Sequence, residues 1–281
     1  MKKINSLLAM TCLCLAMPAF AANGPVRGYL SDAEMVVRIG HDLYATLDPD
    51  LKKTVSPKAV SLQVSSAPWI APIPGTASDA GGQVAISTGF IALLNRIAHA
   101  KAIDRIQPGY FNQYIADLAQ ANENDSPPSL RNLETPRYWN DDILVEQASL
   151  FNQMVGLTLA LNLSHHYLDH CGKYAAQMSA GNAAPLNRFI SESEWGASLQ
   201  CAALNSLDCA LATAGGKVLF DCIERMPHRP AWTFGVVPAH VNFKLMNQQL
   251  SQYERQYFHG NLKSNGRTIV LSSSSAHNPP F

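Results

Sequence analysis

The densest group of chemically reactive side chains lies in "LALNLSHHYLDHCGKY", residues 159–174, where three histidines, an aspartate and a cysteine follow an apolar run. Residues four apart share one face of an α-helix, so His166 and His170 are expected to lie together, with His165 offset. A zinc site on a helix uses two imidazoles at this spacing, a third protein ligand and an open position for water. A nearby carboxylate then acts as the general base, so metal-assisted hydrolysis is the first chemistry to consider.

This stretch resembles the active-site helix of gluzincin zinc metallopeptidases of the CAAX prenyl endopeptidase type, including their soluble periplasmic relatives. Those enzymes carry the pattern H-E-x-x-H-x-x-x-x-H, and here Leu161, Asn162, His165 and His170 stand at its H, E, H and H. Leucine cannot bind a metal, and an amide cannot take a proton from water at neutral pH. The resemblance therefore implies a zincin-like domain whose hydrolytic site is lost or impaired.

Two other segments extend the resemblance to roughly residues 80–260. In "EWGAS", Glu194, Ala197 and Ser198 stand where the family has E-x-x-A-D. Upstream, "GGQVAISTGFI" resembles the family's glycine-rich passage from a strand into a helix. The resemblance implies that Glu194 approaches His165 as a zinc ligand, and that an edge strand at residues 83–87 aligns an extended polypeptide in a groove by backbone pairing.

The histidines allow three other interpretations. "HYLDH" resembles the inverted H-x-x-E-H motif of another class of zinc peptidases, with His166 and His170 as ligands, Glu194 or Glu192 as the third ligand and Asp169 as the base. A non-catalytic zinc site could use some of His165, His166, His170 and Glu194. The histidines could also simply end a buried helix, where imidazoles favourably face the last carbonyl groups. Whether the chain is an enzyme is left open.

The N-terminus has the pattern of a secretory signal peptide. Lys2 and Lys3 precede a short apolar run, and small residues flank Phe20 at a cleavage site after Ala21. Residues 1–21 are therefore predicted to be removed from a periplasmic or secreted protein that retains no membrane span.

Four cysteines remain after the predicted signal, and an oxidising compartment favours disulfide bonds between them. Of the three possible connectivities, we expect Cys171–Cys201 and Cys209–Cys222. A disulfide-stapled binding or envelope-assembly protein without metal is therefore the alternative function. The formal net charge of zero gives no electrostatic sign of a nucleic-acid partner.

Hydrophobic periodicity predicts an α+β, mainly α fold. The helix over residues 143–171 contains "MVGLTLALNL", which is apolar on nearly all sides and so is expected to be central and buried. A small antiparallel sheet is expected to contain residues 59–67 and 83–87. Further helices are expected at 30–47, 89–104, 109–122, 190–216 and 239–258. The domain is expected to span residues 22–260 and to precede a disordered tail, 261–281.

Overall fold

A computed structural model describes residues 28–29, 32–64, 73–74, 82–122, 124–179 and 186–260. The predicted signal peptide, residues 1–21, and the predicted tail, residues 261–281, lie outside the described residues. Both therefore stay predictions.

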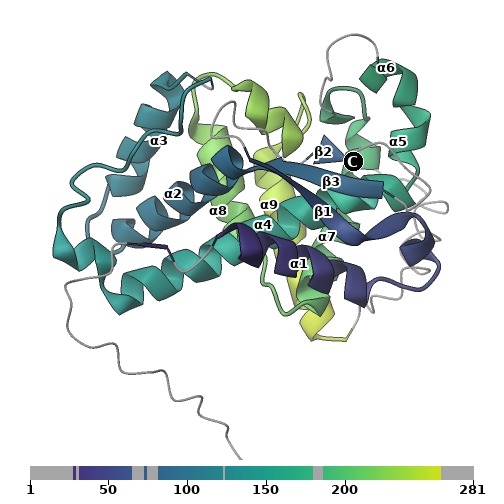
Figure 1. Cartoon of the computed structure of the whole chain (residues 1–281), viewed down its shortest axis with the longest axis horizontal. Helices are drawn as coiled ribbons and strands as arrows, with labels where there is room; N and C mark the ends of the chain where they lie inside the picture. The colour runs from purple at the N-terminus through teal and green to yellow at the C-terminus, as the bar shows by residue number, and fades with distance from the viewer. Residues whose placement is uncertain are drawn as a thin grey trace, which may run out of the picture.

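The long helix α4, Asp141–Tyr167, runs through the centre of the molecule (Figure 1). It begins where the side chain of Asn140 accepts a hydrogen bond from the Ile143 backbone N–H at 3.0 Å. Every residue from Met154 to His166 is buried. Four helices pack around it: α1 (Ala33–Thr46), α2 (Thr88–Asp104), α7 (Glu192–Asp208) and α8 (Ala214–Arg225). The predicted central helix is confirmed.

The remaining elements are short or peripheral, and the fold is mainly helical as predicted. They are the helices α3 (Tyr110–Gln120), α5 (His170–Lys173), α6 (Ala175–Ser179) and α9 (Phe243–Phe258), with the 3₁₀ turns η1 (Leu51–Lys53), η2 (Pro136–Trp139), η3 (Leu186–Arg188) and η4 (Ala231–Gly235). None of the helices in the described part of the chain is both long and apolar enough to cross a membrane.

The sheet differs from the expected antiparallel one. Its strands are β1 (Val55–Gln63), β2 (Ile73–Pro74) and β3 (Gly82–Ser87), in the order β1-β3-β2. β1 and β3 are parallel, and only the two-residue β2 pairs antiparallel with β3. Parallel pairing needs a crossover of about a dozen residues or more, and the segment between β1 and β3 is long enough to provide one. The expectation that residues 83–87 form an edge strand is wrong, because β3 lies between β1 and β2.

The single helix expected over residues 190–216 is in fact two helices. α7 ends at Asp208, Ala210 takes a left-handed conformation with φ 58°, and α8 begins at Ala214. Gly215 is the second residue of α8 and lies directly on α4, since a Cβ at this position would be 2.4 Å from the backbone oxygen of Leu150. Gly215 and Gly216 therefore permit the close packing of α8 on α4.

Cys171, Cys201, Cys209 and Cys222 are all free in the structure. Cys201 and Cys222 are buried, whereas Cys171 and Cys209 are half-buried. Burial raises the pKa of Cys171 and of Cys201 to about 12, so both are protonated thiols at neutral pH. The expected disulfide pairing stays a prediction.

Candidate functional site

The histidine segment turns sharply at the end of α4. The helix ends at Tyr167, and Asp169 takes a left-handed conformation with φ 59°, which aspartate tolerates better than most residues. α5 then begins at His170. The expectation that His166 and His170 share one helical face is wrong, because the helix does not continue between them. The turn brings the ring of His170 back to His165 instead.

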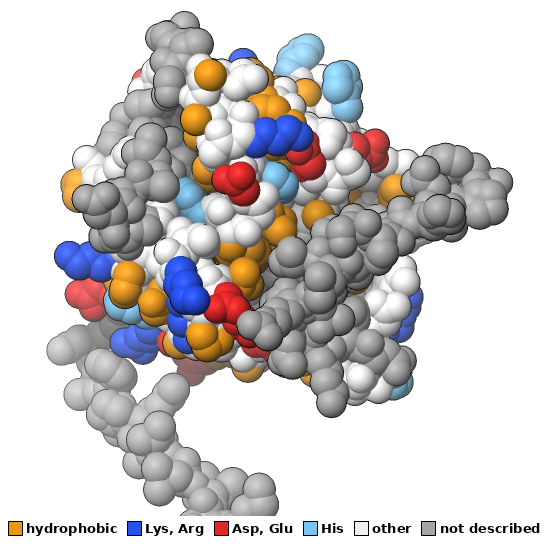
Figure 2. Space-filling view, turned by 90° about the vertical axis from the view of Figure 1, so that its right-hand side faces the viewer, with side chains coloured by type: hydrophobic (Ala, Val, Ile, Leu, Met, Phe, Trp, Pro, Cys, Tyr) orange, Lys and Arg blue, Asp and Glu red, His pale blue; other side chains and the backbone are white. Residues whose placement is uncertain are grey.

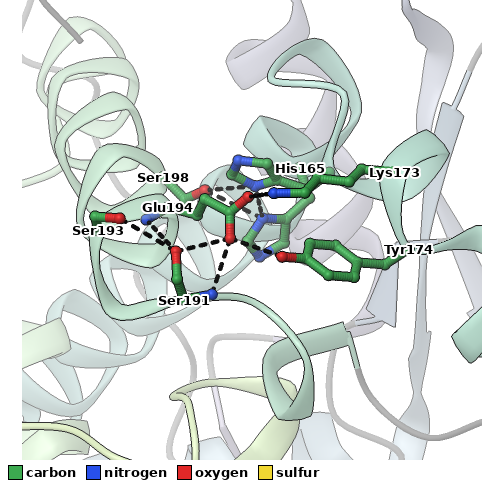
Figure 3. Close-up of polar contacts among 8 residues, drawn as sticks. His165, Lys173, Tyr174, Ser191, Ser193, Glu194 and Ser198 are labelled. Atoms are coloured by element: carbon green, nitrogen blue, oxygen red, sulfur yellow. Dashed lines mark hydrogen bonds and ion pairs between the residues drawn. The ribbon is translucent and has the colours of Figure 1, made fainter.

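His165, His170 and Ser198 form a compact buried cluster between α4, α5 and α7. The two Nδ1 atoms lie 3.0 Å apart, and Ser198 Oγ lies 3.1 Å from His165 Nδ1 and 3.3 Å from His170 Nδ1. His165 and Ser198 are fully buried, and His170 is 6% exposed. Figure 3 shows Ser198 and His165 side by side next to the Glu194 carboxylate. These are three of the positions that the family resemblance singled out.

Both imidazoles of this cluster are held neutral. Burial, followed by the charges of His170 and His166, lowers the pKa of His165 to about 3, although Asn187 and Glu194 act in the opposite direction. Burial also lowers the pKa of His170. At 3.0 Å only one of the two facing Nδ1 atoms can carry a proton, so one ring donates a hydrogen bond to the other. In the part of the chain that the structure describes, His165 Nε2 and Asn187 Oδ1 are both buried without a hydrogen-bond partner.

Glu194 lies in the first turn of α7, and both of its carboxylate oxygens have local partners. Its Oε2 accepts hydrogen bonds from the Ser191 N–H at 2.9 Å, the Ser191 hydroxyl at 2.8 Å and the Tyr174 hydroxyl at 2.9 Å. Its Oε1 forms an ion pair with Lys173 (Figure 3). Burial alone would raise its pKa, but the hydrogen bonds from Lys173, Ser191 and Tyr174 lower it to about 2. The carboxylate completes a capping box with Ser191, which satisfies the first backbone donors of α7.

His166 points away from this cluster and docks on the sheet. Its Nε2 lies 3.1 Å from the backbone oxygen of Gln83, and its ring lies flat against Gly82. Burial lowers its pKa, and the hydrogen bond to Gln83 acts the other way. His166 therefore ties the end of α4 to the start of β3 and does not join His165 and His170.

Leu161 and Asn162, which stand at the family's first metal ligand and general base, are both part of the core. Leu161 is 1% exposed and packs in the main hydrophobic cluster. Asn162 is equally buried, and its Nδ2 donates to the backbone oxygens of Thr158 at 2.8 Å and Gly235 at 3.2 Å. The amide thus links α4 to η4. Asp169, the base of the inverted motif, is exposed, and its carboxylate lies over Gly172.

The donor atoms do not fit the zinc ion that the resemblance implies. A structural or catalytic zinc needs at least three protein ligands in tetrahedral directions. Among the described candidates, only His165 and His170 converge, with their Nδ1 atoms turned to each other and to Ser198. Every described contact of the Glu194 carboxylate is with another protein group. Within the described residues, no group of three histidine, cysteine, aspartate or glutamate side chains could hold a metal. Metal binding here stays a prediction that this geometry does not support.

The cluster lies at the end of the molecule that carries α5 and α6. Figure 2 looks onto this end, where charged and histidine side chains are interspersed with hydrophobic and uncharged ones. The roles of Lys173, Tyr174 and Asn187 could not be predicted from the sequence, because no spacing pattern marks these residues. The role of Glu194 could have been predicted, because Ser191 and Glu194 form the S-x-x-E pattern of a capping box at the start of a helix.

Comparisons with protein families, with curated proteins and with solved structures found no match for this chain.

Proposed function

We propose that this chain is an exported, metallopeptidase-like protein that binds polypeptide without hydrolysing it and holds no zinc. The observation that carries the proposal is the environment of Asn162. At the position of the family's general base stands an amide, which is buried and bonded to the backbone of Thr158 and Gly235. Such a group can neither accept a proton from water nor reach a substrate.

The other departures from the family pattern support the same proposal. Leu161 replaces the first metal ligand and is buried among apolar side chains. Glu194, the family's carboxylate ligand, is used to cap α7 and to bind Lys173. A hydrolytic centre would need both positions free for a metal. Polypeptide binding is the part of the family's function that needs no metal, and we retain it on the strength of the resemblance.

The inverted motif receives less support from the geometry. Its two histidines bind different partners, since His166 contacts Gln83 and His170 contacts His165. Its base, Asp169, lies exposed over Gly172. A peptidase built on this motif would need all three side chains around one ion.

The proposal is tested with a fluorescein-labelled, reduced and carboxymethylated α-lactalbumin, which is an unfolded polypeptide. We expect saturable binding by fluorescence anisotropy and no cleavage products by mass spectrometry, with or without added zinc. Folded α-lactalbumin is the control and is expected not to bind. Cleavage that a chelator abolishes would contradict the proposal, and its loss in Asp169→Asn would point to the inverted motif.

A further inference from the structure

A column of stacked cationic and aromatic side chains lies beside the candidate site. The guanidinium carbon of Arg188 in η3 lies 4.5 Å from the ring centroid of Phe234 in η4, and that of Arg229 lies 4.9 Å from the same centroid. Arg229 also lies 6.0 Å from the ring centroid of Phe243, which opens α9. Two positive charges thus share one phenyl ring, an arrangement in which each cation is attracted by the ring but repelled by the other cation.

Among the residues that the structure describes, no acidic side chain pairs with either of these two charges. Arg229 is half-buried and donates hydrogen bonds to the backbone oxygens of Val237, Pro238 and Ala239, at 3.3, 2.7 and 3.0 Å. Burial lowers its pKa, and no carboxylate acts against that shift. Neither Arg188 nor Arg229 has an ion-pair partner among the described residues.

Arg188 is also available to a ligand. It is exposed, and its guanidinium donates no hydrogen bond to any residue that the structure describes. Stacking on Phe234 holds the planar group in place, so less rotamer entropy is lost when it binds. Arg229 has its Nη atoms occupied by carbonyl oxygens, and it contributes a fixed positive charge 4.9 Å from the centroid of the same ring.

Two residues of the column are sequence neighbours of residues that interact with the candidate site. Arg188 follows Asn187, whose side chain acts on the pKa of His165. Phe234 precedes Gly235, whose backbone oxygen accepts the hydrogen bond from Asn162. The exposed guanidinium of Arg188 is therefore the part of this region that a polypeptide bound at this end of the molecule would contact, while the histidine cluster behind Asn187 stays buried.

We propose that Arg188, supported by Phe234 and Arg229, binds a carboxylate of the bound polypeptide, so that the protein selects acidic segments. This inference rests on the proposed function and names the class of polypeptide that the site takes. A guanidinium fork matches a carboxylate with two parallel hydrogen bonds, and this charge-assisted pairing is roughly twice as strong as a neutral one. A bound carboxylate would also supply the negative charge that the column lacks.

The experiment compares two fluorescein-labelled unstructured peptides by anisotropy. One carries several Asp and Glu residues and a free C-terminal carboxylate. The other has Asn, Gln and a C-terminal amide at the same positions. We expect the acidic peptide to bind about tenfold more tightly, and Arg188→Ala to remove that preference. Arg188→Lys keeps the charge but loses the stacked fork, and it is expected to restore only part of the preference.

Arg105→Ala is the matched control, since it removes an exposed arginine that is already paired with Glu146 and changes the net charge by the same amount. It is expected to bind both peptides like the wild type. Equal binding of the two peptides, or an equal loss in Arg188→Ala and Arg105→Ala, would overturn the inference and leave the proposed function standing. If neither peptide binds, both proposals fail together.

Discussion

The free energy of unfolding is expected to fall by about 2 kcal/mol from His165 alone when the pH is lowered from about 7 to about 5. The pKa of His165 is lowered from 6.5 to about 3 in the folded protein. Below the unfolded value the unfolded chain binds a proton that the folded protein does not. This contribution to stability is therefore complete above about pH 6.5 and is lost progressively as the pH falls toward about 3. Chemical denaturation at a series of pH values measures it.

The cause of this dependence is the surroundings of His165. It faces Ser198 and His170, with Asn187 beside it and Glu194 nearby, and only Asn187 and Glu194 favour its charged form. Burial also lowers the pKa values of His170, His166 and His99, so these residues steepen the same fall.

His165→Gln is expected to reduce the pH slope between about pH 5 and about pH 6.5 by about 1 kcal/mol per pH unit. His41→Gln is the matched control, because His41 is exposed on α1 and its replacement removes the same ionisable group. An unchanged slope in His165→Gln would mean that His165 is accessible to protons in the folded protein, and the buried cluster would then be wrong.

Gly82→Ala is expected to lower the free energy of unfolding by about 2 to 3 kcal/mol, the upper range for overpacking a core position. A Cβ at Gly82 would lie 2.2 Å from His166 Nδ1 and 2.3 Å from its Cγ, so the ring must leave its place on the strand. The hydrogen bond between His166 Nε2 and the Gln83 oxygen would be lost with it. Denaturant unfolding at neutral pH measures the change.

Gly196→Ala provides the control for Gly82→Ala. Gly196 lies inside α7 near Glu194, and a Cβ there would meet nothing within 4 Å. Alanine is a better helix former than glycine, so this variant is expected to be more stable by about 0.5 to 1 kcal/mol. In the double mutant Gly82→Ala with His166→Ala, the steric conflict is removed and the two costs should be less than additive. Strict additivity would show that His166 does not lie on Gly82.

The fold was predictable where the hydrophobic pattern is compatible with only one arrangement of the element. An apolar stretch such as residues 154–163 leaves no face for water, so the helix that carries it must be central. The direction of β1 relative to β3 was not predictable, since alternation of apolar residues is the same for both directions. The break between α7 and α8 was not predicted, and the role of Gly215 beyond it depends on contact with α4, which the local sequence does not show.

The site was predicted only in part. The structure brings together His165, His170 and Ser198, three residues that stand at positions of the family pattern. Helical spacing alone had suggested that His166, and not His165, lies beside His170. Spacing fails there because Asp169 turns the chain through a left-handed residue, a choice that depends on the surrounding structure and not on the local sequence. Glu194 was interpreted as a ligand, whereas Ser191 three residues earlier already indicated a capping box.

Zinc content tests the central claim most directly. The protein is purified without chelator from cells grown with added zinc, its metal is measured by plasma mass spectrometry, and zinc is then titrated back by calorimetry. We expect far less than one zinc per chain and no saturable binding, because His165 and His170 are bonded to each other and Glu194 to Lys173, Tyr174 and Ser191. One tightly held zinc per chain, lost in both His165→Gln and Glu194→Gln, would contradict the account.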